Sequence, residues 1–328
     1  MTTDDPAARV EDEDLRPPRV SIGVPVYNGA EYLAACLESL LAQTFQDLEI
    51  IVSDNASTDE TPAIARAYAV LDPRIRLVES RVNIGGNRNF HRVLELSRGA
   101  YFKWAAHDDL CEPVFVERCV DVLDRDSSVV CCHARTVKID ASGRPVPGLP
   151  DPTRASAGGG AARAQARFRD VLLHTGYGAR SFGLMRAAAL KACHPLLPVY
   201  GSEKVLMAEL ALRGRFHDID EVLFYERVHA AAASALPTAA AQQAFAAPSR
   251  AGGRFAPRLR LLAGYADAVR RVPLPVVERA CCALALGSYL FQVRKWRAVV
   301  RSVLASTGTG GHQTAEVAKS AEARDAAV

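Results

Sequence analysis

Residues 20–61 read "VSIGVPVYNGAEYLAACLESLLAQTFQDLEIIVSDNASTDET", and this stretch decides the fold. Its β-branched start, residues 19–27, is typical of a buried strand. Apolar residues at helical spacing then predict an amphipathic helix: Leu33, Cys36, Leu37, Leu40 and Leu41. Residues 48–54 predict the next strand, and the alternation continues through 75–80, 87–97 and 100–106. We therefore predict an α/β fold with a doubly wound, mainly parallel sheet flanked by helices.

Composition narrows the class of protein. The chain has 328 residues, 49% of them hydrophobic, which is enough for a sizeable core. A net charge of +3 is too small to indicate a basic surface for nucleic acid, so we expect no nucleic-acid partner. The eight cysteines lie mostly in apolar runs without a C-x-x-C spacing, so we expect reduced thiols in a cytoplasmic protein. The longest apolar run, residues 280–293, is too short to span a membrane.

Polar residues follow the predicted strands where each strand ends. They are Pro25, Tyr27 and Asn28 after the first strand, Asp54, Asn55, Ser57 and Asp59 after the second, and Asp108 and Asp109 after the fourth. Each group has a local explanation as a turn, an Asx turn with a helix cap, or an acidic helix start. In open α/β sheets, however, ligands bind at the carboxyl ends of the strands. The convergence of three segments favours a ligand site.

The chemistry of that site follows from what the first turn lacks. The turn has only Gly23 and Gly29, so it is neither a G-x-G-x-x-G turn nor a phosphate-binding P-loop. Phosphates bound here would need another source of positive charge. A divalent cation held by carboxylate oxygens supplies it, which explains the paired acids Asp108 and Asp109.

Residues 20–61, followed by "NIGGNRNF" (83–90) and "GAYFKWAAHDD" (99–109), resemble the nucleotide-sugar domain of family 2 glycosyltransferases. The resemblance continues more loosely through residues 181–190, 201–216 and 222–229. It implies a GT-A fold, inverting sugar transfer from a nucleotide-diphosphate sugar, and a divalent cation, Mn²⁺ or Mg²⁺. The donor is expected to be UDP-linked, and the acceptor a saccharide or lipid-linked sugar of a cell-surface polysaccharide or glycoconjugate.

The resemblance also implies roles for single residues. Nucleotide binding is assigned to Pro25, Tyr27, Asn28, Asp54, Asn83, Arg88 and Asp108, with Asp54 on the base and Arg88 beside the diphosphate. Asp108 matches the last acid of the family's D-x-D metal motif, and Asp109 the acid that often follows it. Ala106 departs from the motif, because it stands where the first acid is expected. Another ligand must then fill the metal shell.

Two residues of the second half have both a functional and a structural interpretation. Glu203 matches the family's general base, yet an acid in the first turn of a helix that Ser202 caps also complements the helix dipole. His229 ends a predicted strand and is expected to complete the metal shell, although a lone histidine is more often structural. His107 is not assigned to the metal, because in a continuing strand it would point to the opposite side.

The expected organisation has five parts. Residues 1–17 and 306–328 form disordered tails, 18–110 the nucleotide-sugar half, 111–250 the acceptor and catalytic half, and 251–305 a C-terminal helical extension. Residues 139–165 are expected to form a surface loop, lid or insertion. The C-terminal helices carry arginines beside apolar faces, which has two interpretations. The helices either contact the inner membrane face peripherally or pack on the domain. A non-catalytic sugar-binding protein and a nucleotidyltransferase are the alternative functions.

Overall fold

The structure is a computed structural model that describes residues 16–149, 151, 160–174, 177–236, 238–247 and 257–290. The chain divides into two units, Met1–Leu286 and Gly287–Val328, and only residues 287–290 of the second are described. The tail expected at 306–328, nearly all of the tail at 1–17, and residues 291–305 of the helical extension lie outside the described residues.

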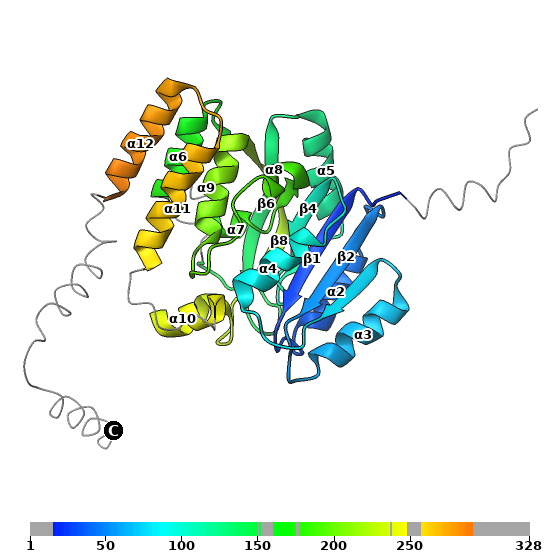
Figure 1. Cartoon of the computed structure of the whole chain (residues 1–328). Coiled ribbons are helices and arrows are strands. Elements are labelled where there is room, and N and C mark those ends of the chain that lie inside the picture. Colours follow the sequence, from blue (N-terminus) through cyan, green and yellow to red (C-terminus); the bar gives the residue numbers. More distant parts are fainter. Residues whose placement is uncertain are drawn as a thin grey trace, which may run out of the picture. The chain divides into compact units, whose positions relative to one another are not determined.

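The predicted α/β fold is confirmed (Figure 1). Within the described residues, one eight-stranded sheet has the order β3-β2-β1-β4-β7-β6-β8-β5. Its strands are β1 (Val20–Val26), β2 (Leu48–Asp54), β3 (Ile75–Glu79), β4 (Tyr101–Trp104), β5 (Leu110–Cys111), β6 (Val129–Ile139), β7 (Leu184–Arg186) and β8 (Arg215–Arg227). The strands β1 to β4 pair in parallel, as the sequence predicts. Beyond β4 the sheet is mixed, because β7 and β5 pair with their neighbours in antiparallel fashion.

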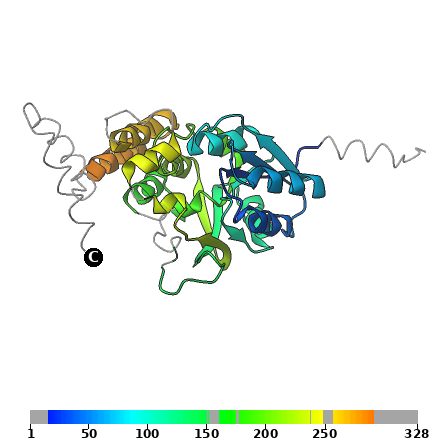
Figure 2. The ribbon, with the colours of Figure 1, turned by 90° about the horizontal axis from the view of Figure 1, so that it is seen from below.

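Helices cover the sheet and connect its strands. They are α2 (Leu33–Leu41), α3 (Thr61–Leu71), α4 (Gly86–Glu95), α5 (Phe115–Arg125), α6 (Ala164–Leu173), α7 (Tyr177–Arg180), α8 (Ala187–Lys191), α9 (Glu203–Arg213), η3 (Ala233–Ala235), α10 (Ala239–Ala246), α11 (Pro257–Arg271) and α12 (Val276–Leu290). The helix α11 packs against α9, and α12 follows it in the chain (Figures 1 and 2). No helix of the described residues is both long and apolar enough to cross a membrane.

The two faces of β1 meet different helices. Val20, Ile22, Val24 and Val26 are buried in the same cluster as the apolar face of α2. On the other face stands Gly23, where a Cβ would lie 2.5 Å from the Val93 side chain of α4. Any larger residue there would push α4 off the sheet, so this glycine sets the distance at which α4 packs. β1 is buried on both faces, and its large apolar residues alternate with the smaller Ser21, Gly23 and Pro25.

The helix α9 is buried on every side. Residues 205–212 are all buried, and α6 and α11 pack against this helix. This explains why the sequence shows two apolar faces instead of one. Glu209 is tolerated there because its carboxylate bonds to Arg213 at 2.7 Å and accepts the His194 N–H at 2.9 Å.

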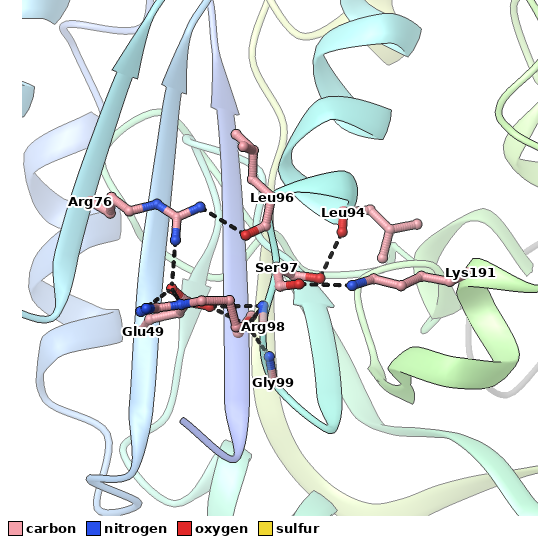
Figure 3. A network of polar contacts seen from close by, with 9 residues as sticks. Glu49, Arg76, Leu94, Leu96, Ser97, Arg98, Gly99 and Lys191 are labelled. Atoms are coloured by element: carbon pink, nitrogen blue, oxygen red, sulfur yellow. Dashed lines mark hydrogen bonds and ion pairs between the residues drawn. The ribbon is translucent and has the colours of Figure 1, made fainter. Parts of the chain in front are cut away.

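A buried carboxylate holds together the end of the sheet where β1 and β2 begin (Figure 3). Glu49 accepts from the Ser21 hydroxyl at 2.7 Å and from the Arg98 guanidinium at 2.9 Å, and Arg76 reaches it at 3.2 Å. Arg76 also donates to the Leu96 carbonyl at 2.7 Å. Burial acts to raise the pKa of Glu49, but the hydrogen bonds from Ser21 and Arg98 outweigh it and the pKa is lowered. The network ties β1, β2 and β3 to the end of α4.

We predict that Glu49→Gln lowers the free energy of unfolding by about 2 kcal/mol at pH 7, because the hydrogen bonds to a charged acceptor are lost. Folding holds the pKa of Glu49 below its ordinary 4.5. The stabilisation is therefore complete above pH 4.5 and is lost as the pH falls through the lowered value. Urea denaturation of the variant and of the wild type at pH 7 and pH 3 measures both effects.

Glu95→Gln is the control, because the Glu95 side chain is 66% exposed and should change stability by less than about 0.5 kcal/mol. A difference between Glu49→Gln and wild type that stays constant down to pH 3 would contradict the linkage.

Candidate functional site

The loops that follow β1 and β2 are joined by hydrogen bonds. Asn28 has a positive φ of 50°, and its side-chain oxygen accepts the Thr58 N–H at 2.8 Å. Its own N–H donates to the Ser57 hydroxyl at 2.9 Å. Asp59 accepts the Ala30 N–H at 3.2 Å and the Thr61 N–H at 3.0 Å. Asn28, Ser57 and Asp59 therefore shape the rim, as the turn and cap interpretation predicts.

The loop after β3 joins the same rim. Asn55 donates to the Asn83 side-chain oxygen at 3.0 Å and accepts the Ile84 N–H at 2.8 Å. Asn83 also accepts the Gly85 N–H at 2.8 Å. Asn55 and Asn83 thus link the loops after β2 and β3, and Asn28 links the loops after β1 and β2. The side-chain oxygen of Asn83 is engaged within the protein, although the residue itself is exposed.

Asp54 is buried at this rim with one oxygen unpaired. Its Oδ2 accepts the Ser57 N–H at 3.2 Å, whereas Oδ1 is buried without a hydrogen-bond partner. A buried carboxylate oxygen in this state is costly unless a ligand donates to it. Tyr27, at the end of the neighbouring strand, is 44% exposed and Pro25 is buried within β1. An unpaired acceptor and an exposed aromatic ring at the ends of neighbouring strands suit a flat ligand that carries N–H groups.

Asp108 and His229 come together although they are 121 positions apart in the sequence. His229 Nε2 lies 2.9 Å from Asp108 Oδ2, and both side chains are largely buried. The short strand β5 brings them together, because Leu110 pairs with Tyr225 in β8. The structure thus brings together the acid and the histidine that the sequence analysis assigns to one metal site.

Asp109 lies beside this pair but faces the protein. Its Oδ1 accepts the Arg227 N–H at 2.9 Å, and only 6% of the residue is exposed. Burial and the neighbouring Asp108 raise the pKa of Asp109 well above its ordinary value. By accepting this hydrogen bond from Arg227 of β8, the Asp109 carboxylate holds the turn after β4 in place.

His107 lies in a turn and not in a strand. β4 ends at Trp104, and residues 106–109 form a turn in which Asp109 N–H donates to the Ala106 carbonyl at 3.2 Å. The alternation of a strand therefore does not apply to His107. Its ring lies against Gly29, and burial lowers its pKa, with Asp108, His229 and Asp59 as the charged groups that face it.

Glu203 is the first residue of α9, as predicted. Ser202 occupies the N-cap position, but its side chain makes no capping bond and instead accepts from Asn87 at 3.0 Å. The same Asn87 amide donates to the Leu197 and Val199 carbonyls at 2.7 and 2.9 Å. The start of α4 thus holds the segment that leads into Glu203. Burial raises the pKa of Glu203. Among the described residues, no hydrogen bond or ion pair joins it to Asp108 or His229.

Arg88 is exposed on α4 and lines a hollow of about 400 Å³ together with Arg81 and Arg92. The hollow also includes Ser80 and Ile84 of the β3–α4 loop, but neither Asp108 nor His229 lines it. Arg88 and Asp108 therefore do not line the same hollow. Three guanidinium groups line the hollow, and so do the carboxylates of Glu79 and Glu95.

Sequence reasoning missed two residues of the site. The Tyr32 ring packs on the His229 ring with 4.7 Å between centroids, and the Arg227 guanidinium lies 4.7 Å from the Tyr32 centroid. Tyr32 reads as part of the α2 pattern and Arg227 as an ordinary strand residue. The only signal for Arg227 is its place two residues before His229.

The mixed sheet and its rim define the chain as an α/β protein of the GT-A type. The fold is similar to that of S. aureus TarS bound to UDP, with a TM-score of 0.58 and 17% identity over 86% of this chain and 75% of that one. It is also similar to mannosyltransferase PcManGT from Pyrobaculum calidifontis in complex with GDP-Man and Mn²⁺, with a TM-score of 0.54 and 18% identity over 95% and 81% of the two chains.

Residues 21–191 match glycosyl transferase family 2, and the chain belongs to this family. It is 38% identical over 128 residues to chondroitin synthase of Escherichia coli, covering 39% of this chain and 18% of the relative. It is 33% identical over 120 residues to the putative glycosyltransferase EpsH of Bacillus subtilis, covering 36% and 34%. The chain spans about a third or less of the length of these curated relatives.

We predict that Gly29→Ala destabilises the protein by about 1–3 kcal/mol, because the added Cβ would lie 2.3 Å from the His107 ring and 2.7 Å from Val26. Gly287→Ala is the control. Nothing lies within 4 Å of its Cβ, and alanine inside α12 should stabilise by about 1 kcal/mol. Denaturant unfolding measures both variants, and a Gly29→Ala protein as stable as wild type would contradict the close packing of His107.

Proposed function

We propose that the protein is an inverting glycosyltransferase that transfers a sugar from a nucleotide-diphosphate sugar, UDP-linked in the first instance, to a saccharide or lipid-linked acceptor. The observation that carries the proposal is the contact of 2.9 Å between Asp108 and His229 at the end of β4. It supports the metal and diphosphate role that the family pattern implies for these residues. Family membership supports the reaction class.

The nucleotide is proposed to bind along the rim from β2 to β4. The unpaired Asp54 Oδ1 would accept an N–H of the base, and the exposed Tyr27 ring would pack against it, beside Pro25 and Asn28. Asn83 and Arg88 follow along the β3–α4 segment, where Arg88 would meet a phosphate. The Asp54 acceptor suits a base that carries an N–H, which uracil, guanine and thymine all do. Titration with UDP, GDP and dTDP therefore identifies the nucleotide.

The residues at the end of β4 fit a divalent cation only in part. Asp108 and His229 supply one oxygen and one nitrogen donor, a pair that suits Mn²⁺. Among the described residues, no three His, Cys, Asp or Glu side chains are grouped to hold a metal ion. We therefore propose that Asp108 and His229 hold the cation together with diphosphate oxygens, with Asp109 as the buried anchor of the turn or as a further ligand. When bound, the cation would supply charge neutralisation for the leaving diphosphate.

Glu203 is proposed as the general base. A carboxylate in this role accepts the proton of the acceptor hydroxyl as its oxygen attacks the anomeric carbon. Burial raises the pKa of Glu203, which makes the carboxylate a better proton acceptor than an exposed one. Asn87 fixes the segment before Glu203 to α4, so the base would be held relative to the nucleotide half.

The cell-surface acceptor and the cytoplasmic location, at the inner face of the membrane, remain proposals from family membership. The alternative class is a non-catalytic sugar-binding protein, which Ala106 favours because it removes one acid of the metal motif.

We predict that Asp108→Ala weakens Mn²⁺-dependent binding of UDP by about 100-fold, because loss of a direct ligand costs at least as much as loss of a residue that orients one. His229→Ala should show the same direction. Calorimetric titration with UDP, with and without Mn²⁺, measures the effect. Asp121→Asn, on the surface of α5, is the control for loss of an acid. Metal-dependent binding that Asp108→Ala leaves unchanged would refute the assignment.

We predict that Glu203→Gln lowers the transfer rate by about 10²–10⁴-fold and leaves UDP binding intact, because the base acts only on the acceptor. In the wild type the rate should fall on the acidic side at a pH above the ordinary 4.5 of glutamate, since the raised pKa of Glu203 leaves the base protonated there. Product formation followed across pH tests both points. Wild-type binding of nucleotide sugar with no transfer and no hydrolysis would support the non-catalytic alternative.

A further inference from the structure

Arg227 is a buried arginine whose guanidinium has no carboxylate partner in the described part of the chain. It is the last residue of β8 and only 6% of it is exposed. Among the described residues, no Asp or Glu side chain forms an ion pair with it. Burying an unpaired guanidinium is expensive, so its hydrogen bonds must compensate for the lost water. Those bonds show what the side chain holds.

The guanidinium donates only to main-chain carbonyls. Nε donates to the Asp108 carbonyl at 2.8 Å, and Nη1 donates to the carbonyls of Asp140 and Ala141 at 3.0 Å each. The N–H of Arg227 itself donates to the Asp109 carboxylate at 2.9 Å. One residue therefore fixes the turn that carries Asp108 and Asp109. It also ties this turn to the start of the segment after β6.

Arg227 reaches His229 through an aromatic ring. Its guanidinium lies 4.7 Å from the centroid of the Tyr32 ring, and the Tyr32 ring lies 4.7 Å from the His229 ring. The cation and the imidazole both pack on Tyr32, which restricts the orientation of His229 toward Asp108. Both members of the Asp108–His229 pair are thus held by the same side chain, one through its main chain and one through Tyr32.

We propose that Arg227 is the positioning residue of the Asp108–His229 pair and that it compensates for the missing acid at Ala106. With Ala106 in place of a carboxylate, Asp108 is the one remaining acid of the motif that faces His229. Asp108 and His229 can contact a metal–diphosphate group together only if the relative orientation of their side chains is fixed. Arg227 fixes that orientation. This role rests on the proposed function.

The chain offers a matched control in Arg186 of β7. Its guanidinium also donates to main-chain carbonyls, those of Val129 at 2.8 Å, Leu123 at 2.5 Å and Asp126 at 3.0 Å, and lies 5.8 Å from the Tyr101 ring. Arg186 pairs with Tyr101 at the start of β4, whereas Asp108 follows the end of that strand. Replacing Arg186 removes the same kinds of contact without touching the site.

The experiment compares Arg227→Met, Arg227→Lys and Arg186→Met by thermal unfolding and by titration with two probes. UDP with Mn²⁺ reports on the Asp108–His229 pair. Uridine alone, followed by ligand-observed NMR, reports on the Asp54 part of the rim. We expect both Met variants to melt at lower temperature. Only Arg227→Met should weaken binding of UDP with Mn²⁺, by about 10–100-fold, while its uridine binding stays at the wild-type level.

Arg227→Lys keeps the positive charge, but its single ammonium nitrogen cannot take the positions of both Nε and Nη1, so we expect it to remain impaired. It also serves as the second variant if Arg227→Met does not fold. Equal UDP affinities of the Arg227 variants and Arg186→Met would overturn the positioning role, as would a parallel loss of UDP and uridine binding. Full recovery by lysine would show that charge alone acts, which also overturns it. Wild-type protein that binds no nucleotide sugar overturns the proposed function itself, and with it this role.

Discussion

The short pairing of β5 with β8 is the contact on which the candidate site depends. Leu110 pairs with Tyr225 and Cys111 with Phe224, and through these two residue pairs the end of the parallel half meets the last strand. The turn that carries Asp108 is thereby placed against the end of β8, where His229 follows. Without this antiparallel addition, the acid and the histidine would belong to separate parts of the sheet. The mixed half of the sheet therefore brings side chains from separate strand-end loops together into one site.

Side-chain bonds between loops supply the second constraint. Asn28 bonds the loop after β2, and Asn55 bonds the loop after β3, so the strand ends are fixed by amides instead of by apolar packing. Asp54 lies within this frame with one oxygen unpaired. At the opposite end of the strands Glu49 makes the corresponding links, but every one of its contacts is internal (Figure 3). The contrast between a satisfied carboxylate and an unsatisfied one separates the structural end of the sheet from the end suited to binding.

Much of the site could be predicted because local patterns set it. Asp54 and Asp108 follow apolar runs, and residues at the ends of parallel strands share one edge whatever the tertiary details. His107 and Asp109 could not be placed in the same way. β4 ends at Trp104, two residues earlier than its apolar pattern suggests, and His107 and Asp109 lie in the turn that follows. Strand alternation is a local rule, and it fails at the residue where the strand ends.

The sequence by itself determined the parallel half of the sheet, its helices, the polar strand ends and the family. Strands that are buried on both faces appear as apolar runs, which can be recognised without the tertiary structure. Only the tertiary structure decided that Asp109 faces inward, that Ser202 bonds Asn87 instead of capping α9, and that Arg227 joins Asp108 to Tyr32. Each of these hydrogen bonds joins residues that are more than 100 positions apart in the sequence. No periodicity or short motif encodes such a pairing, because it arises only when the strands lie side by side.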